Sequence, residues 1–117
     1  MSYEVFSTRA ADRDILKAVD YIEFVLHNPQ AADSLLDEID TKINSLSENP
    51  ERYAVVSDPV LKSWQIRFIQ VKNYLAFYVI SESERCVYVV RFLYDRRDWV
   101  GILRSTLVDV SGINKLL

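Results

Sequence analysis

The sequence predicts an α+β fold with an N-terminal strand, an α-helical hairpin packed on an antiparallel β-meander, and a short C-terminal helix. Two patterns predict it. Apolar residues recur at helical spacing between residues 15 and 46, and strand-like runs with short links occupy residues 64–94. The chain has 117 residues, of which 50% are hydrophobic and 26% charged. This composition is typical of one globular domain, spanning 1–117.

The first half of the chain contains a strand followed by two helices. Residues Tyr3–Ser7 alternate in polarity, as in a short strand. A first apolar stripe with helical spacing consists of Ile15, Leu16, Val19, Ile22, Val25 and Leu26, and a second of Ala32, Leu35, Leu36, Ile39, Ile43 and Leu46. Asn28 is a good N-cap, and Pro29 suits the first helical position. Because the link is so short, we expect an antiparallel helical hairpin, which ends before Asn49-Pro50.

The second half predicts a sheet. Three strand-like runs follow one another, at Trp64–Gln70, Tyr74–Ile80 and Cys86–Tyr94. Their short links predict an antiparallel meander, with the N-terminal strand at one edge. Residues 51–62 lack a clean period and contain the turn signal Asp58-Pro59, so we expect a loop with at most a short strand at Tyr53–Val56. Arg97–Leu107 is expected to form the last helix, and residues 108–117 a looser tail.

The core is expected where the apolar stripes of the hairpin meet one face of the sheet. The residues that we predict to be buried there are Val19, Ile22, Leu36, Ile39, Ile43 and Phe77. The opposite face of the sheet then stays open, and function should be sought on it.

Composition excludes several kinds of functional site. The single Cys86 excludes an internal disulfide and a cysteine-rich zinc site, and the single His27 excludes a site with several histidine ligands. Two glycines are too few for a Gly-rich phosphate loop. The sequence shows no run of about 18 apolar residues and no secretory signal. We therefore expect a cytoplasmic protein without a metal, a cofactor or a membrane partner.

Charge is distributed unevenly within the net charge of −3. Residues 1–50 carry four basic and ten acidic side chains, whereas residues 51–117 carry ten basic and seven acidic ones. The second half is therefore basic enough to meet an anionic partner. A solvated surface with scattered charges is the alternative interpretation.

The end of the last predicted strand is the most distinctive stretch. Across residues 89–99 an apolar run meets a cluster of charges. Side chains alternate along a strand, so Arg91 is expected on one face with Val89 and Leu93, and Tyr94 on the other.

Arginines and tyrosines form the candidate site. We expect Arg67, Arg91 and Arg97 to converge with Tyr94 at one end of the sheet. Arginine side chains there would suit an anionic ligand, since their forks bind phosphate or carboxylate. Tyrosines nearby stack on bases or donate hydrogen bonds. Further candidates for binding are Arg91, Arg96, Tyr74, Tyr78 and Arg104.

A simpler interpretation keeps these residues structural. Arg91 then pairs with the carboxylate of Asp95 or Asp98, and the tyrosines belong to the core and its rim. Conventional catalytic groups are poorly indicated. We interpret His27 as a helix-end residue and Cys86 as a packed core thiol.

Three segments, taken in order, carry a resemblance to a known family. Leu46–Pro50 matches a helix end of the form "sL..nP", Lys72–Tyr78 a strand "gnYlifY", and Val89–Asp98 an ending "v.RvlhgrRd". Across residues 3–104 the chain thus resembles the RelE/ParE superfamily of toxins from bacterial type II toxin–antitoxin modules. The resemblance implies a single toxin domain over 1–117.

The resemblance also implies a partner and two possible targets. The partner is a cognate antitoxin whose C-terminal segment wraps the toxin, and DNA is contacted only through that antitoxin. ParE-like members inhibit DNA gyrase without cutting nucleic acid, whereas RelE-like members enter the ribosome and cut mRNA. The shared fold does not decide between them, and a non-toxic binding domain of the same fold is a further alternative.

Residue by residue, the ParE-like activity is the one that we favour. In a ribonuclease Arg67 and Arg97 would clamp phosphate, and Tyr94 stands where many ribonuclease members have a histidine. An ordinary tyrosine has a pKa of about 10 and is a poor base at neutral pH. The acidic helical hairpin also suits ribosomal RNA poorly.

Overall fold

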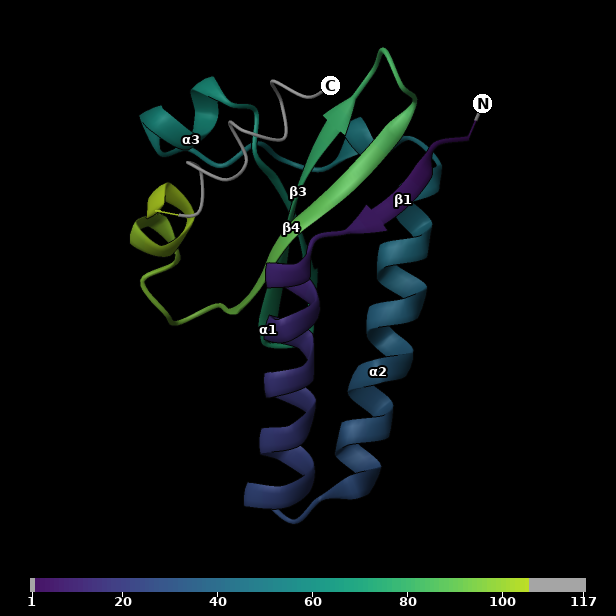
Figure 1. Cartoon of the computed structure of the whole chain (residues 1–117), viewed down its shortest axis with the longest axis vertical. Helices are drawn as coiled ribbons and strands as arrows, with labels where there is room; N and C mark the ends of the chain where they lie inside the picture. The colour runs from purple at the N-terminus through teal and green to yellow at the C-terminus, as the bar shows by residue number, and fades with distance from the viewer. Residues whose placement is uncertain (1, 106–117) are drawn as a thin grey trace.

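The structure, a computed structural model, describes residues 2–105. It contains a four-stranded sheet in the order β1-β4-β3-β2, with a helical hairpin that extends beyond one end of the sheet (Figure 1). In chain order the elements are β1 (Glu4–Ser7), α1 (Arg9–Asp20), η1 (Tyr21–Val25), α2 (Pro29–Asn44), η2 (Ser45–Ser47), η3 (Pro50–Arg52), α3 (Pro59–Ser63), β2 (Arg67–Val71), β3 (Tyr74–Ser81) and β4 (Cys86–Tyr94). Residues 99–105 form a further helix, and the end of the predicted 97–107 helix and the predicted tail at 108–117 lie outside the described residues.

The predicted helical hairpin is confirmed. The hydroxyl of Thr8 accepts a hydrogen bond from the Ala11 amide at 3.1 Å and begins α1. The side chain of Asn28 accepts one from the Ala31 amide at 3.1 Å, and Pro29 occupies the first turn of α2. A π-helical turn, η1, continues α1 to the link. Among the described residues no helix is long and apolar enough to cross a membrane.

The buried face of α2 differs from the prediction at one position. Leu35 is 1% exposed, whereas Leu36, which we expected in the core, is 38% exposed. Neighbouring helical residues point about 100° apart. The face that meets the sheet is set by Ala32, Leu35 and Ile39, so Leu36 lies at its margin.

The sheet places the first strand of the chain beside the last one. β2, β3 and β4 form the predicted antiparallel meander, and β1 lies at the predicted edge, parallel to β4 with Glu4 opposite Cys86. The predicted strand over 64–70 is wrong at its start, because α3 continues to its C-cap at Trp64. Asp58 caps this helix by accepting a hydrogen bond from the Leu61 amide.

The region expected to be a loop is therefore partly helical. α3 begins inside residues 51–62 and ends at Ser63, and the short strand expected at 53–56 is reduced to a single bridge between Val55 and Arg67. A five-residue helix is too short to show a helical period in the sequence, so only its Asp-Pro start was visible there.

The second face of the sheet is covered, which corrects the expectation of an open face. α3 and helix 99–105 lie on the side away from α2 (Figure 1). They contribute Leu61 and Leu103 to a second apolar cluster, which also contains Phe77 and is separate from the hairpin-side core. Phe77 is buried as expected, but on this face rather than against the hairpin. The candidate functional site must therefore be sought on the hairpin side of the sheet.

A β-bulge in β4 changes which residues share a face. Phe77 is opposite Arg91 but Tyr78 is opposite Val89, so Val90 is an extra residue. Val89 consequently packs in the hairpin-side core and Leu93 in the second cluster. The prediction that the two share a face with each other and with Arg91 is wrong, because simple alternation assumes a regular strand.

Candidate functional site

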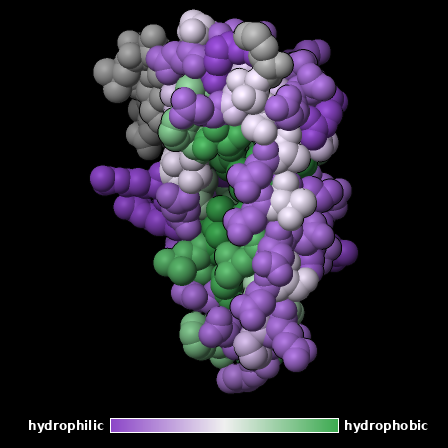
Figure 2. Space-filling model, turned by 90° about the vertical axis from the view of Figure 1, so that its right-hand side faces the viewer, coloured by the Kyte–Doolittle hydropathy of each residue, from purple (hydrophilic) through white to green (hydrophobic). Residues whose placement is uncertain are grey.

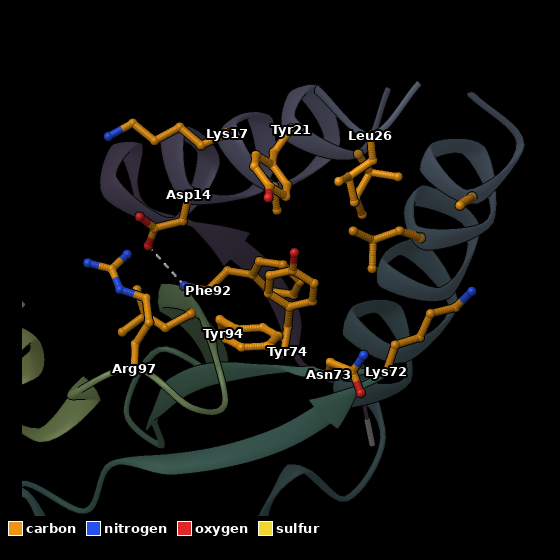
Figure 3. Close-up of a pocket in the computed structure, with 15 residues that line it drawn as sticks. Asp14, Lys17, Tyr21, Leu26, Lys72, Asn73, Tyr74, Phe92, Tyr94 and Arg97 are labelled. Atoms are coloured by element: carbon orange, nitrogen blue, oxygen red, sulfur yellow. Dashed lines mark hydrogen bonds between the residues drawn. The ribbon is translucent and has the colours of Figure 1, made fainter. Parts of the chain in front are cut away.

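A pocket of about 750 Å³ opens between the helical hairpin and the end of the sheet (Figure 3). Its walls come from α1, η1, the start of α2, the β2–β3 turn and the end of β4. The lining residues are Asp14, Lys17, Ala18, Tyr21, Ile22, Leu26, Ala31, Leu35, Lys72, Asn73, Tyr74, Phe92, Leu93, Tyr94 and Arg97. Figure 2 shows apolar surface gathered over the half of the molecule that the hairpin forms, bordered by hydrophilic residues.

Aromatic rings from two strands form one wall of the pocket. The antiparallel register places Tyr74 opposite Tyr94. The Tyr74 ring stacks on Phe92 with centroids 4.9 Å apart and meets the edge of Tyr94 at 5.6 Å. Burial raises the pKa of Tyr74 above its ordinary value, and the neighbouring Tyr94 and Tyr21 raise it further. The Tyr74 hydroxyl therefore stays neutral, and this wall offers an apolar surface with hydroxyl groups.

Three cationic side chains line the same pocket from three separate segments. Lys17 comes from α1, Lys72 from the β2–β3 turn, and Arg97 from the segment after β4. The Lys72 ammonium donates a hydrogen bond to the Ser34 hydroxyl at 2.6 Å. None of the three cations forms an ion pair with another described residue. The rim is therefore positively charged around an apolar interior.

Asp14, the acidic residue of the pocket, is fully engaged. Its carboxylate accepts hydrogen bonds from Arg91 Nε at 2.6 Å, Arg91 Nη2 at 2.9 Å and the Phe92 amide at 3.0 Å. This group joins α1 to β4 beside the bulge. Arg91 therefore has a structural partner, as the simpler interpretation expected, but the partner is Asp14 rather than Asp95 or Asp98.

Arg67 lies elsewhere, so the expected convergence of three arginines is wrong. Its guanidinium donates to the backbone carbonyls of Glu51 at 2.9 Å and Tyr53 at 2.5 Å. Arg67 begins β2, opposite Tyr78 in the middle of β3, whereas the pocket lies at the other end of β2. The expected proximity holds for Tyr94 and Arg97, which both line the pocket.

The remaining candidate residues are spread over the molecule. Tyr74 lines the pocket, and Arg96 is exposed in the turn after β4. Arg104 pairs with Asp58 at 2.7 Å and so joins helix 99–105 to α3. This hydrogen bond lowers the pKa of the Asp58 carboxyl. Tyr78 is 0% exposed, and its hydroxyl donates to the Pro50 carbonyl, so its proposed binding role is wrong.

Tyr78 predicts a loss of stability at high pH. Burial raises the pKa of Tyr78 from 10.0 to about 12. Since the folded state favours the neutral hydroxyl, its contribution is fully present below about pH 10 and is lost as the pH rises through about 12, a loss of about 2–3 kcal/mol. Denaturant unfolding of the wild type and Tyr78→Phe across this range measures it.

Tyr88 titrates in the same range, because burial and a hydrogen bond to Glu84 raise its pKa to about 12. It does so in both proteins, so the difference between them isolates Tyr78. Parallel pH profiles for the wild type and Tyr78→Phe would contradict the prediction.

Several pocket residues had no clear signal in the sequence. Asp14, Lys17 and Tyr21 lie at i, i+3 and i+7, which is one helical face. This face flanks the apolar stripe, and a polar face beside such a stripe is ordinarily a solvated surface. The structure shows that this helical face borders the pocket, because the end of the sheet lies opposite it. Among residues 2–105 no group of three His, Cys, Asp or Glu side chains is placed to hold a metal ion.

The chain matches one known protein family over most of its length. The sequence profile of one family, described as "ParE toxin of type II toxin-antitoxin system, parDE", matches residues 5–99. No curated protein matches the chain.

Two solved structures have a similar fold. The chromosomal ParDE toxin–antitoxin system from P. aeruginosa aligns with a TM-score of 0.64 and 16% identity, over 80% of this chain and 96% of that chain. The toxin–antitoxin complex RelBE2 from Mycobacterium tuberculosis aligns with a TM-score of 0.56 and 20% identity, over 80% and 92%. At these identities the similarities establish the α+β fold that the sequence predicted.

Proposed function

Because the chain belongs to the family of ParE toxins of type II toxin–antitoxin systems, we propose that it arrests bacterial growth by inhibiting DNA gyrase. The family membership confirms the resemblance inferred from the three sequence motifs. In the proposed activity the protein acts in the cytoplasm by binding its target and does not cut nucleic acid.

The separation of the arginines is the observation that carries this proposal. Cleavage of RNA without a metal needs a base, an acid and cations gathered around one phosphate. Arg67 is held by backbone carbonyls away from the pocket, and Arg91 is held by Asp14. The side chains that line the pocket together suit the binding of a partner better than they suit proton transfer.

The proposed function includes neutralisation by a cognate antitoxin. The two similar structures are described as toxin–antitoxin assemblies. The apolar pocket between hairpin and sheet offers a docking site for a segment that folds on binding. We propose that the C-terminal segment of the antitoxin lies along this groove, and that DNA is contacted only through the antitoxin.

RelE-like cleavage of mRNA on the ribosome is the second candidate. It is favoured by one observation, that Tyr94 and Arg97 line one pocket with Lys17 and Lys72. These groups would stabilise phosphate charge, but the phenol of a tyrosine is a weak proton acceptor at neutral pH.

Assays with the purified protein distinguish inhibition of gyrase from cleavage of mRNA. We expect inhibition of plasmid supercoiling by gyrase, intact mRNA on ribosomes, and unchanged inhibition by Tyr94→Phe, which removes only a hydroxyl. Arg96→Glu, which reverses an exposed charge, is expected to weaken inhibition.

The ribonuclease alternative predicts a different pattern. Arg97→Ala would then abolish mRNA cleavage while ribosome binding persists, because an arginine that stabilises developing charge acts mainly in the transition state. Cleavage of ribosome-bound mRNA without any effect on gyrase would reject our proposal. In cells, expression of the chain alone should arrest growth, and co-expression of its antitoxin should restore it.

A further inference from the structure

The face of the helical hairpin that points away from the pocket carries exposed apolar side chains. Leu16 on α1 is 60% exposed and Leu36 on α2 is 38% exposed, and neither is among the residues that line the pocket. Asp14, which does line it, lies two residues before Leu16 and so about 160° away around the helix axis. Near the link of the hairpin, which extends beyond the sheet (Figure 1), Phe24 is exposed outside the pocket as well. We call this surface, with Leu16 and Leu36 at its centre, the outer face of the hairpin.

The α1 part of the outer face is mainly basic. In exposed positions at i, i+4, i+7 and i+11, which share one side of a helix, it carries Arg9, Arg13, Leu16 and Asp20. Asp12, a further acidic residue nearby, accepts a hydrogen bond from the Ser7 hydroxyl at 2.5 Å. Positive charge therefore borders Leu16 on the side of the sheet, and Asp20 lies toward the link.

The α2 part of the outer face is acidic. In exposed positions at i, i+3, i+4 and i+7 it carries Asp33, Leu36, Asp37 and Asp40. Lys42, the one basic residue of α2, is half-buried and lies two residues after Asp40, about 160° away around the helix. No ion pair between described residues joins the charged residues of the two parts. The outer face thus presents a basic helix beside an acidic one.

This pattern of charge complements itself under a two-fold rotation. Two copies can meet through the outer face about an axis parallel to the hairpin, which places α1 of each copy against α2 of the other. An axis perpendicular to the hairpin instead places α1 against α1 and α2 against α2. The perpendicular axis brings like charges together, whereas the parallel axis brings opposite charges together, so charge complementarity favours the parallel axis.

The heights of the residues along the hairpin fit the same arrangement. Rotation about an axis parallel to the hairpin leaves the height of every residue unchanged. Arg13 precedes His27, in the link, by about as many residues as Asp40 follows it, and the same holds for Leu16 and Leu36. Arg13 of one copy is then level with Asp40 of the other at the border of the contact, and the two leucines are level at its centre.

We propose that the outer face of the hairpin is a dimer interface, in which α1 of each copy packs against α2 of a second copy of this chain. The two-fold axis repeats every contact, so the complementarity of the basic and acidic helices acts twice. The pocket of each copy stays free, because its lining residues lie on the other side of α1 and α2. This inference goes beyond the proposed function and depends on neither gyrase nor an antitoxin.

Sedimentation equilibrium of the full chain over a range of concentrations measures the dissociation constant of the dimer. Leu16→Glu places a charge at the centre of the contact and should raise this constant at least about tenfold. Arg13→Glu and Asp40→Lys should each raise it at least about fivefold, because each brings like charges together twice. Lys62→Glu is the matched control. It makes the same change of charge at an exposed position on α3, on the side of the sheet away from α2, and should leave the constant unchanged.

Mixing the two charge variants tests which helices face each other. In a dimer of one Arg13→Glu chain and one Asp40→Lys chain, both pairs regain opposite charges, so an equimolar mixture should dimerise about as tightly as the wild type. Asp20→Lys should strengthen the dimer, because Asp20 is level with Asp33 of the other copy and the change turns a like-charge contact into an attractive one. Circular dichroism of every variant verifies that the fold is unchanged.

A chain that stays monomeric at every concentration would overturn the proposal, and so would a dimer that Leu16→Glu leaves as tight as before. Two further results would show that α1 does not face α2 and would equally overturn it. One is a mixture that dimerises no more tightly than the separate charge variants. The other is a weaker dimer for Asp20→Lys, as contact between two α1 helices would produce.

Discussion

Replacing Asp14 with alanine is expected to lower the free energy of unfolding by about 3–5 kcal/mol, because the change breaks a largely buried charge pair from one side. The Asp14 side chain is 10% exposed and that of Arg91 19%. The same carboxylate also accepts a hydrogen bond from the Phe92 amide at 3.0 Å. One substitution thus removes three hydrogen bonds between α1 and β4. Denaturant unfolding followed by circular dichroism measures the loss.

Asp20→Ala provides the control for this prediction. Asp20 is exposed at the end of the same helix, and its removal is expected to change the unfolding free energy by less than about 0.5 kcal/mol. If Asp14→Ala were equally mild, the Arg91 contact would contribute little to the docking of α1, and Arg91 would return to the set of candidate binding residues.

Leu35→Ala is the second substitution with a large expected effect. Leu35 is 1% exposed and packs in the hairpin-side core, and it also lines the pocket. Removing its side chain is expected to cost about 2–5 kcal/mol of unfolding free energy, through lost burial and the cavity left behind. The substitution should also widen the pocket, because Leu35 is one of its lining residues.

Leu36→Ala makes the same chemical change one residue later in the same helix. Because Leu36 is 38% exposed, its cost is expected to stay below about 1 kcal/mol. Denaturant unfolding of the two variants side by side is decisive. A larger loss for Leu36→Ala than for Leu35→Ala would mean that α2 presents a different face to the sheet.

The sequence predicts the elements with strong periodicity and misses those that depend on distant packing. The stripes of α1 and α2 and the runs of β3 and β4 are long enough for their period to be read. Within the five residues of α3 no helical period can be recognised. The extra residue Val90 cannot be seen in a pattern that assumes alternation. Because α3 and the bulge both change which residues pack on each face of the sheet, the sequence does not predict the second apolar cluster.

The same limit applies to the candidate site. Tyr94 and Arg97 were predicted near one another because both lie at the end of the last strand. Asp14 lies 77 residues from Arg91 in sequence, and nothing local links the two. Arg67 was misplaced because the antiparallel register pairs it with Tyr78, at the end of β2 that is far from the pocket. Local patterns therefore predicted that Tyr94 and Arg97 are close, whereas the aromatic wall and the cationic rim required the tertiary structure.

The pairing of β1 with β4 has a consequence for biosynthesis. Glu4 is translated well before its partner Cys86, which lies 82 residues later in the chain. At about 5–20 residues per second the N-terminal strand waits roughly 4–16 s for that partner. Tyr94 and Arg97 are translated later still, so a nascent chain bears the helical hairpin before it bears the pocket. A protein that recognises the pocket therefore recognises only chains translated past Arg97.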